Sequence, residues 1–303
     1  MAASQSILTA ATLDDCAAVH SGILTEMGEE QMPLKQNRRE AALTKELLAV
    51  QKQEQKMEKA ARKSKPARWK TELERRIPQK VYAGLESAFC KAFGLIFDKG
   101  RVVIEKGYSK EELQADHAIR DFAVQLKGGR KELKQMHKSA KQSDLVNMAV
   151  TTVEGIGLGA LGIGMPDIVL FLGNLLKGIY ETALHYGFDY ESKQEQLLIL
   201  KMMQTALSSG ETWILKNAEV DEMLSFETVG LTDELFRQQV KDTASAFAMD
   251  MLLLKFIQGL PLVGIFGGAA NPIYYSKVMK YVQLKYRKRY LLKQRNGRTA
   301  ANG

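Results

Sequence analysis

Four acidic and imidazole side chains are the best candidates for chemistry in this sequence. Glu154 and Asp167 bracket a glycine-rich apolar run, where burial would raise their pKa values towards those of a general acid or base. Glu181 and His185 lie four residues apart, so on a helix they share one face and could hold a metal ion together. Plainer roles are available, because Asp167 follows Pro166 and suits a helix N-cap. These four residues are the candidate catalytic residues of a hydrolase or metalloenzyme.

Other catalytic motifs are either absent or in the wrong context. Residues 157–162 match the dinucleotide fingerprint G-x-G-x-x-G, and Glu181 lies near the distance expected of a ribose-binding acid. That fingerprint needs a helix that starts inside the glycines and faces the pyrophosphate, whereas Pro166 and Asp167 stop the segment and no βαβ units follow. No H-E-x-x-H, C-x-x-C, P-loop or G-x-S-x-G motif occurs. We therefore expect no cofactor and no bound metal.

Two glycine-rich apolar segments, residues 154–189 and 256–276, are expected to organise the fold. Small residues one helical turn apart allow helix backbones to approach closely in a protein core or in lipid. The glycines in question are Gly155, Gly159, Gly164, Gly264 and Gly268. The second segment has 21 residues without charge, which as a helix would reach about 31 Å, but Pro261 and Pro272 would break it. Three interpretations stay open: a buried hairpin, a re-entrant or interfacial membrane element, and spanning helices.

The rest of the chain has the periodicity of amphipathic helices. Ser109 followed by Glu112 is a capping box that starts one helix. Asp189 can cap another that begins near residue 191, and Thr232 begins a third. No stretch alternates with period two for long enough to indicate a strand. The sequence predicts an all-α fold, a multi-helix bundle around two glycine-rich apolar helical hairpins.

Composition and charge suggest one main domain with distinct ends. The 303 residues are 45% hydrophobic and 26% charged, which is ordinary for a folded domain. We expect an acidic lead over residues 1–35, a single helical domain over residues 36–293 and a disordered tail over residues 294–303. The net charge of +8 is concentrated in residues 277–298, which contain nine Lys or Arg and no acid.

The basic C-terminal helix, residues 273 to about 294, has two kinds of interpretation. In the plain one, a stripe that includes Tyr275, Met279 and Tyr286 docks the helix and its charged back faces solvent. In the sharper one, the charged back binds anionic lipid headgroups, each cation contributing about 1 kcal/mol. The predicted headgroup residues are Lys277, Lys280, Lys285, Arg287, Lys288 and Arg289. Nucleic acid is not expected as a partner, since no helix-turn-helix, zinc finger or aromatic platform motif accompanies the charge.

Several stretches of this sequence resemble the EcsC family, over roughly residues 40–292. The stretches are Trp69 ahead of Pro78, residues 164–167, residues 186–189, residues 261–271 and residues 289–291. The resemblance implies a bacterial, mainly helical protein, encoded in some cases beside an ABC transporter of the Ecs type. It implies no established catalytic residues.

Two classes of function remain after these considerations. The preferred hypothesis is a membrane-associated accessory or regulatory protein that binds an anionic membrane surface, with a membrane transporter or another membrane protein as a further partner. The alternative is an uncharacterised hydrolase or metalloenzyme with its site in the helical core. Cys16 and Cys90 suggest no disulfide framework, and the first residues lack the pattern of a signal peptide. We therefore expect a cytoplasmic protein at the inner face of the cell membrane.

Overall fold

In the computed structural model, the described residues form helices joined by turns and short loops, without strands. The described residues are 11–63, 75–100, 104–105, 107–150, 165–225, 231–257 and 270–296. The elements in chain order are α1 (Ala11–Lys63), α3 (Gln79–Leu95), a π-helical turn η1 (Ile96–Gly100), α5 (Lys110–Lys127), α6 (Arg130–Val150), α7 (Met165–His185), α8 (Lys193–Leu207), α9 (Gly210–Ser225), α10 (Asp233–Ile257) and α11 (Ala270–Asn296). The predicted all-α bundle is confirmed.

The glycine runs that were expected to form two hairpins lie outside the described residues. The structure does not describe residues 151–164 and 258–269. These two ranges contain Glu154 and all five of the glycines named in the sequence analysis. The hairpins therefore stay predictions. In the part of the chain that the structure does describe, no helix has the length and hydropathy needed to cross a membrane.

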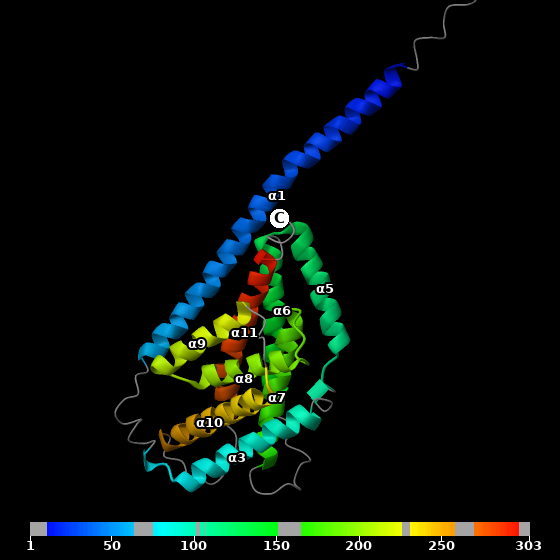
Figure 1. Cartoon of the computed structure of the whole chain (residues 1–303). Helices are drawn as coiled ribbons and strands as arrows, with labels where there is room; N and C mark the ends of the chain where they lie inside the picture. Colours follow the sequence, from blue (N-terminus) through cyan, green and yellow to red (C-terminus); the bar gives the residue numbers. More distant parts are fainter. Residues whose placement is uncertain are drawn as a thin grey trace, which may run out of the picture.

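Helix α11 lies at the centre of the bundle (Figure 1), where it packs against α1, α6, α7, α8 and α9. Its tyrosines, among them Tyr274, Tyr281, Tyr286 and Tyr290, are buried. Helices α7 and α8 supply many of the apolar residues around them, because most of the described residues of both helices are buried. The predicted docking stripe of this helix is thus buried, and much of the opposite face is buried as well.

Helices α3 and α10 pair with each other and close one end of the bundle against α7 and α8. Phe89 of α3 stacks on Phe247 of α10, with ring centroids 5.2 Å apart, and Phe171 of α7 meets the same ring edge-on at 6.0 Å. Large aromatic side chains dominate the burial of apolar area in such contacts. Contacts between phenylalanine rings thus hold this end of the bundle together.

Side-chain caps begin three of the described helices, α5, α8 and α10. The Ser109 hydroxyl accepts a hydrogen bond from the Glu112 backbone at 3.2 Å, as the capping box predicts. Thr232 caps α10 in the same way at its own start. The prediction for Asp189 is wrong: the cap of α8 is Ser192, whose hydroxyl accepts from the Glu195 backbone. Asp189 instead accepts from the Glu191 backbone, a local turn that precedes the helix.

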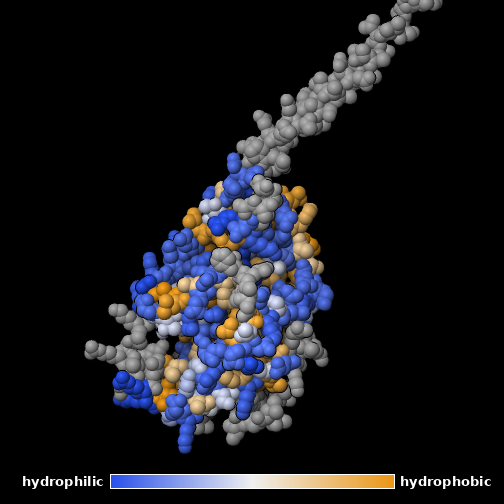
Figure 2. All heavy atoms as spheres, in the orientation of Figure 1, coloured by the Kyte–Doolittle hydropathy of each residue, from blue (hydrophilic) through white to orange (hydrophobic). Residues whose placement is uncertain are grey.

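Helix α1 runs unbroken through residue 35, where the acidic lead was predicted to end. Its second half packs along α6, α9 and α11 through Ala42, Leu43, Val50 and Ala61. Figure 2 shows a largely hydrophilic exterior on this side of the molecule, with hydrophobic patches at the rim near α5. The edge where α1 meets the α5–α6 connection positions the candidate site.

Candidate anion-binding surface

A tight turn at Gly128 joins α5 to α6 and fixes both helices against α1. Gly128 has φ +58, a left-handed conformation that glycine adopts without strain, and its backbone N–H donates to the Val124 carbonyl to end α5. A Cβ at this position would lie 3.0 Å from side-chain carbons of Arg39 on α1. Glycine is therefore required here both by the backbone conformation and by the close approach of α1.

Two hollows lie side by side at this turn and share Arg130 and Lys131. The first has a volume of about 410 Å³ and is lined by Arg38, Ala41, Ala42, Lys45, Gly129, Arg130, Lys131 and Glu132. The second has a volume of about 460 Å³ and is lined by Arg130, Lys131, Lys134, Gln135 and Lys138. We call the six cations of the two hollows the basic edge: Arg38, Lys45, Arg130, Lys131, Lys134 and Lys138.

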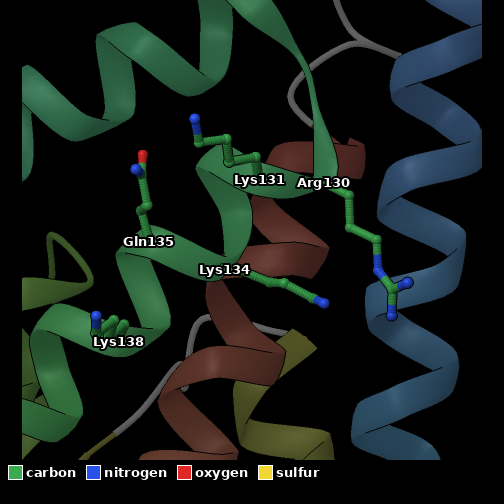
Figure 3. Close-up of a pocket in the computed structure, with 5 residues that line it drawn as sticks. All are labelled: Arg130, Lys131, Lys134, Gln135 and Lys138. Atoms are coloured by element: carbon green, nitrogen blue, oxygen red, sulfur yellow. The ribbon is translucent and has the colours of Figure 1, made fainter.

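Figure 3 shows how the α6 side chains of the basic edge are spread around the helix. Arg130 and Lys134 extend towards α1, whereas Lys131 and Lys138 extend away from it. Both hollows are open to solvent, and all six cations are exposed residues. Glu132 is the acid that lines the first hollow, and its carboxylate lies close to Gly129 at the start of α6. The carboxylate of Glu132 thus occupies the N-terminus of α6, where an external anion would otherwise be attracted by the helix dipole. An external anion would therefore bind to the side-chain cations instead.

A buried carboxylate anchors this edge to the centre of the bundle. Arg130 Nε donates to Glu46 Oε1 at 2.6 Å, and Arg287 of α11 donates to the other oxygen of Glu46. Burial raises the pKa of Glu46, but hydrogen bonds and positive charge from Arg130 and Arg287 outweigh burial and hold this pKa below its ordinary value. The ion triad therefore ties α1, α6 and α11 together beneath the hollows.

The lysines of α6 are available to bind an external anion. Among the described residues, no carboxylate lies within ion-pair distance of Lys131, Lys134 or Lys138. Exposed ammonium groups gathered along one helix attract phosphate groups through charge and N–H donors. Sequence reasoning missed this site, although Lys131, Lys134, Lys138 and Lys141 recur every three or four residues, a spacing that gathers their Cα atoms on one side of a helix before the side chains spread apart.

Four of the predicted headgroup cations on α11 form ion pairs with other helices, and two of the four, Lys285 and Arg287, are buried. Lys285 is 0% exposed, and its ammonium lies 2.6 Å from Glu54 of α1 and 2.5 Å from Asp221 of α9. Lys288 reaches the same two carboxylates, at 2.9 Å each. A lipid headgroup could contact Lys285 only if α1 or α9 moved away from α11.

Arg287 and Arg289 also have partners on other helices. Arg287 joins the Glu46 triad, and Arg289 Nη1 donates to both oxygens of Glu195 at 2.8 and 2.7 Å. Lys277 pairs with Asp250 at 3.0 Å. Of the six predicted headgroup residues, Lys280 is exposed and the other five are buried or partly buried, so the headgroup role of these residues stays a prediction.

Two of the four predicted catalytic residues, Glu181 and His185, have side chains that the structure describes. Glu181 and His185 are both buried on α7, but Glu181 lies 4.0 Å from Lys177 and His185 Nδ1 lies 3.8 Å from Asp116 of α5. Burial lowers the pKa of His185 below its ordinary value. No group of three or more potential metal ligands occurs among the residues described. The side chains of Glu154 and Asp167 lie outside that part, so the enzyme hypothesis stays a prediction.

Comparison with known proteins places this chain in one family. The sequence model of the EcsC protein family matches residues 41–291. Protein EcsC of Bacillus subtilis (strain 168) is 28% identical over 147 residues, which are 46% of this chain and 57% of the relative. The uncharacterized protein YdbA of the same organism is 28% identical over 149 residues, 47% of this chain and 53% of the relative.

The aligned part thus spans about half the length of the curated relatives that the chain matches. No solved structure matches the chain significantly. The family model, however, covers well over half of the chain and takes in the described helices from the second half of α1 to α11. The protein therefore belongs to the EcsC protein family.

Proposed function

We propose that this protein is an accessory protein that binds the cytoplasmic surface of an anionic membrane through the basic edge. One observation carries the proposal: Lys131, Lys134 and Lys138 are exposed together beside two hollows and have no carboxylate partner among the described residues. Each cation near an anionic lipid surface contributes about 1 kcal/mol of attraction. The proposed partner is thus still an anionic membrane, as the sequence predicts, but the main contact with it is made by α6 instead of α11.

The position of the basic edge supports a peripheral mode of binding. The cations lie on a ridge made by the ends of α5 and α6 and by α1, and the Glu46 triad holds that ridge in place. Cations carried by helices that are already fixed relative to each other lose less conformational freedom on binding than cations on a mobile segment do. The family resemblance implies a transporter-linked role in some cases, and an accessory protein bound in this way could meet a transporter at the membrane surface.

Vesicle flotation tests the proposal directly. The purified full chain is mixed with neutral or anionic phospholipid vesicles, each at low and high salt. We expect flotation with anionic vesicles at low salt and a marked loss at high salt, because salt screens exposed charges. Replacing Lys131, Lys134 and Lys138 with Gln removes about 3 kcal/mol of attraction, which corresponds to a roughly hundredfold weaker partition.

A matched variant controls for net charge. Lys52, Lys56 and Lys59 are exposed on α1, away from the hollows, so their replacement by Gln removes the same charge from another place. We expect this control to float like the wild type. Equal losses in both variants would show that net charge alone drives the binding, and no flotation of the wild type under any condition would reject the proposal.

A further inference from the structure

Helix α5 turns its large apolar side chains outwards. Ile119, Phe122 and Leu126 are 70%, 64% and 66% exposed, and their spacing of three and four residues places them on one face of the helix. We call these three residues the α5 stripe. An exposed cluster of large apolar side chains is an informative departure from the usual surface, whereas single exposed residues are common.

The inward face of α5 explains why the stripe points to solvent. His117 Nδ1 lies 3.0 Å from the His185 carbonyl oxygen of α7, and the Tyr290 hydroxyl of α11 donates to Asp121 at 2.7 Å. Asp116 accepts from Arg120 on the same helix at 2.7 Å. These polar contacts lie on the side of α5 that meets the bundle. The inward face of α5 therefore combines these polar side chains with the buried Val124, while the apolar stripe faces outwards.

The stripe ends at the basic edge. Leu126 is followed by Lys127, Gly128 and Gly129, and α6 then begins with Arg130. Hydrophobic surface lies along the rim in Figure 2 near the position of α5 in Figure 1, with hydrophilic surface around it. The acids Glu111 and Glu112 lie at the opposite end, in the first turn of α5. Apolar side chains and cations therefore lie together near the α5–α6 connection, with Glu132 as the acid at the start of α6 and Glu111 and Glu112 at the far end of α5.

We propose that the α5 stripe inserts into the lipid bilayer just below the headgroups that the basic edge binds. This inference rests on the proposed function, and it adds the mode of attachment and the side chains that enter the hydrocarbon. Apolar residues flanked by Lys and Arg are the pattern of interfacial helices, whose apolar face is buried at the boundary between headgroups and acyl chains. The positive charge beside the stripe favours an anionic bilayer over a neutral apolar partner.

The charge distribution also sets the depth of insertion. Cations near Leu126 are attracted to the headgroup layer, whereas Glu111 and Glu112 at the other end are repelled by it. The helix should therefore tilt, with Leu126 deepest, Phe122 next and Ile119 shallowest. No segment has to cross the bilayer in this mode.

Tryptophan quenching by brominated lipid tests the insertion. Phe122→Trp places a fluorophore in the stripe, and the wild-type protein, with its native tryptophans, gives the baseline. With vesicles of brominated phosphatidylglycerol, the additional emission of Phe122→Trp should be quenched and shifted to the blue. Leu215→Trp is the matched control, since Leu215 is 67% exposed on α9, a helix on another side of the bundle.

A second variant removes the stripe itself. With Ile119, Phe122 and Leu126 changed to Ser, the protein should keep its helical content, because these side chains face solvent. Its residual binding to anionic vesicles at high salt should fall by about tenfold or more, since insertion of even one such side chain can be worth that factor. Binding at low salt should fall less, because the basic edge remains.

The outcomes separate this inference from the proposed function. Salt-sensitive flotation of the wild type, without quenching in Phe122→Trp and without an effect of the Ser variant, would overturn insertion and leave the basic edge as the contact. Absence of flotation under all conditions would overturn both proposals. A wild-type dimer in solution that becomes monomeric in the Ser variant, with unchanged vesicle binding, would overturn insertion and assign the stripe to a second copy of the chain.

Discussion

Replacing Lys285 with Met should destabilise the protein without weakening its attachment to membranes. Lys285 is fully buried between Glu54 and Asp221, so its loss leaves two carboxylates with less compensating charge. Breaking a buried pair by removing one partner costs about 3 to 5 kcal/mol. Lys288 still reaches both carboxylates at 2.9 Å. Both carboxylates are also partly exposed, so we expect a smaller loss, about 2 to 3 kcal/mol.

Urea unfolding followed by circular dichroism measures this loss. With a slope of about 3 kcal/mol per molar urea for a chain of this size, the midpoint should fall by about 0.7 to 1 M. Lys280→Met is the control on the same helix, because Lys280 is exposed and such a change is usually worth less than about 0.5 kcal/mol.

Two results would refute the reasoning. A loss in Lys285→Met no larger than in Lys280→Met would show that Lys285 is not held in a buried ion pair. A folded Lys285→Met protein whose flotation falls as far as that of the basic-edge variant would show that Lys285 binds headgroups, as the sequence alone suggested.

Two further predictions concern the α5–α6 connection and its surroundings. Gly128→Ala should lower the free energy of unfolding by about 1 to 3 kcal/mol, because φ is +58 and the new Cβ would press on Arg39; a variant as stable as the wild type in urea would contradict this. Burial, with the charges of Arg287 and Lys141, lowers the pKa of His137 to about 4. The unfolded chain therefore binds more protons between about pH 6.5 and pH 4, and His137 should remove up to about 3 kcal/mol of stability as the pH falls through that window. His137→Asn should flatten this part of the stability profile, and an unchanged profile would be evidence against the assignment.

Local signals in the sequence predicted local structure well. The Ser109 capping box and the start of α10 at Thr232 depend on residues within one turn of each other, and both occur as expected. The start of α8 was misplaced because Asp189 and Ser192 are both good caps, and only the path of the chain after Gly187 decides between them.

Long-range features could not be predicted in the same way. The periodicity of α5 identifies a helix but not which face turns inwards, which depends on partners such as Tyr290 at a distance of 169 residues in sequence. The sequence of α11 predicts a cationic solvent or lipid face because the partners of its cations lie far away along the chain: Arg287 and Glu46 are 241 residues apart. The sequence pattern of a helix shows which of its faces is charged, but it does not show which other helices pack against that face.

The separation between α1 and α11 has a consequence for synthesis. Glu54 emerges from the ribosome 231 residues before Lys285, which at about 5 to 20 residues per second is a delay of roughly 10 to 50 seconds. During that interval the acids of α1 lack their partners on α11, and the apolar side chains of α7 and α8 that α11 covers in the folded protein stay uncovered. We expect nascent chains to depend on chaperones until α11 is released. Chains cut short before this helix should be degraded rather than accumulate as a smaller folded core.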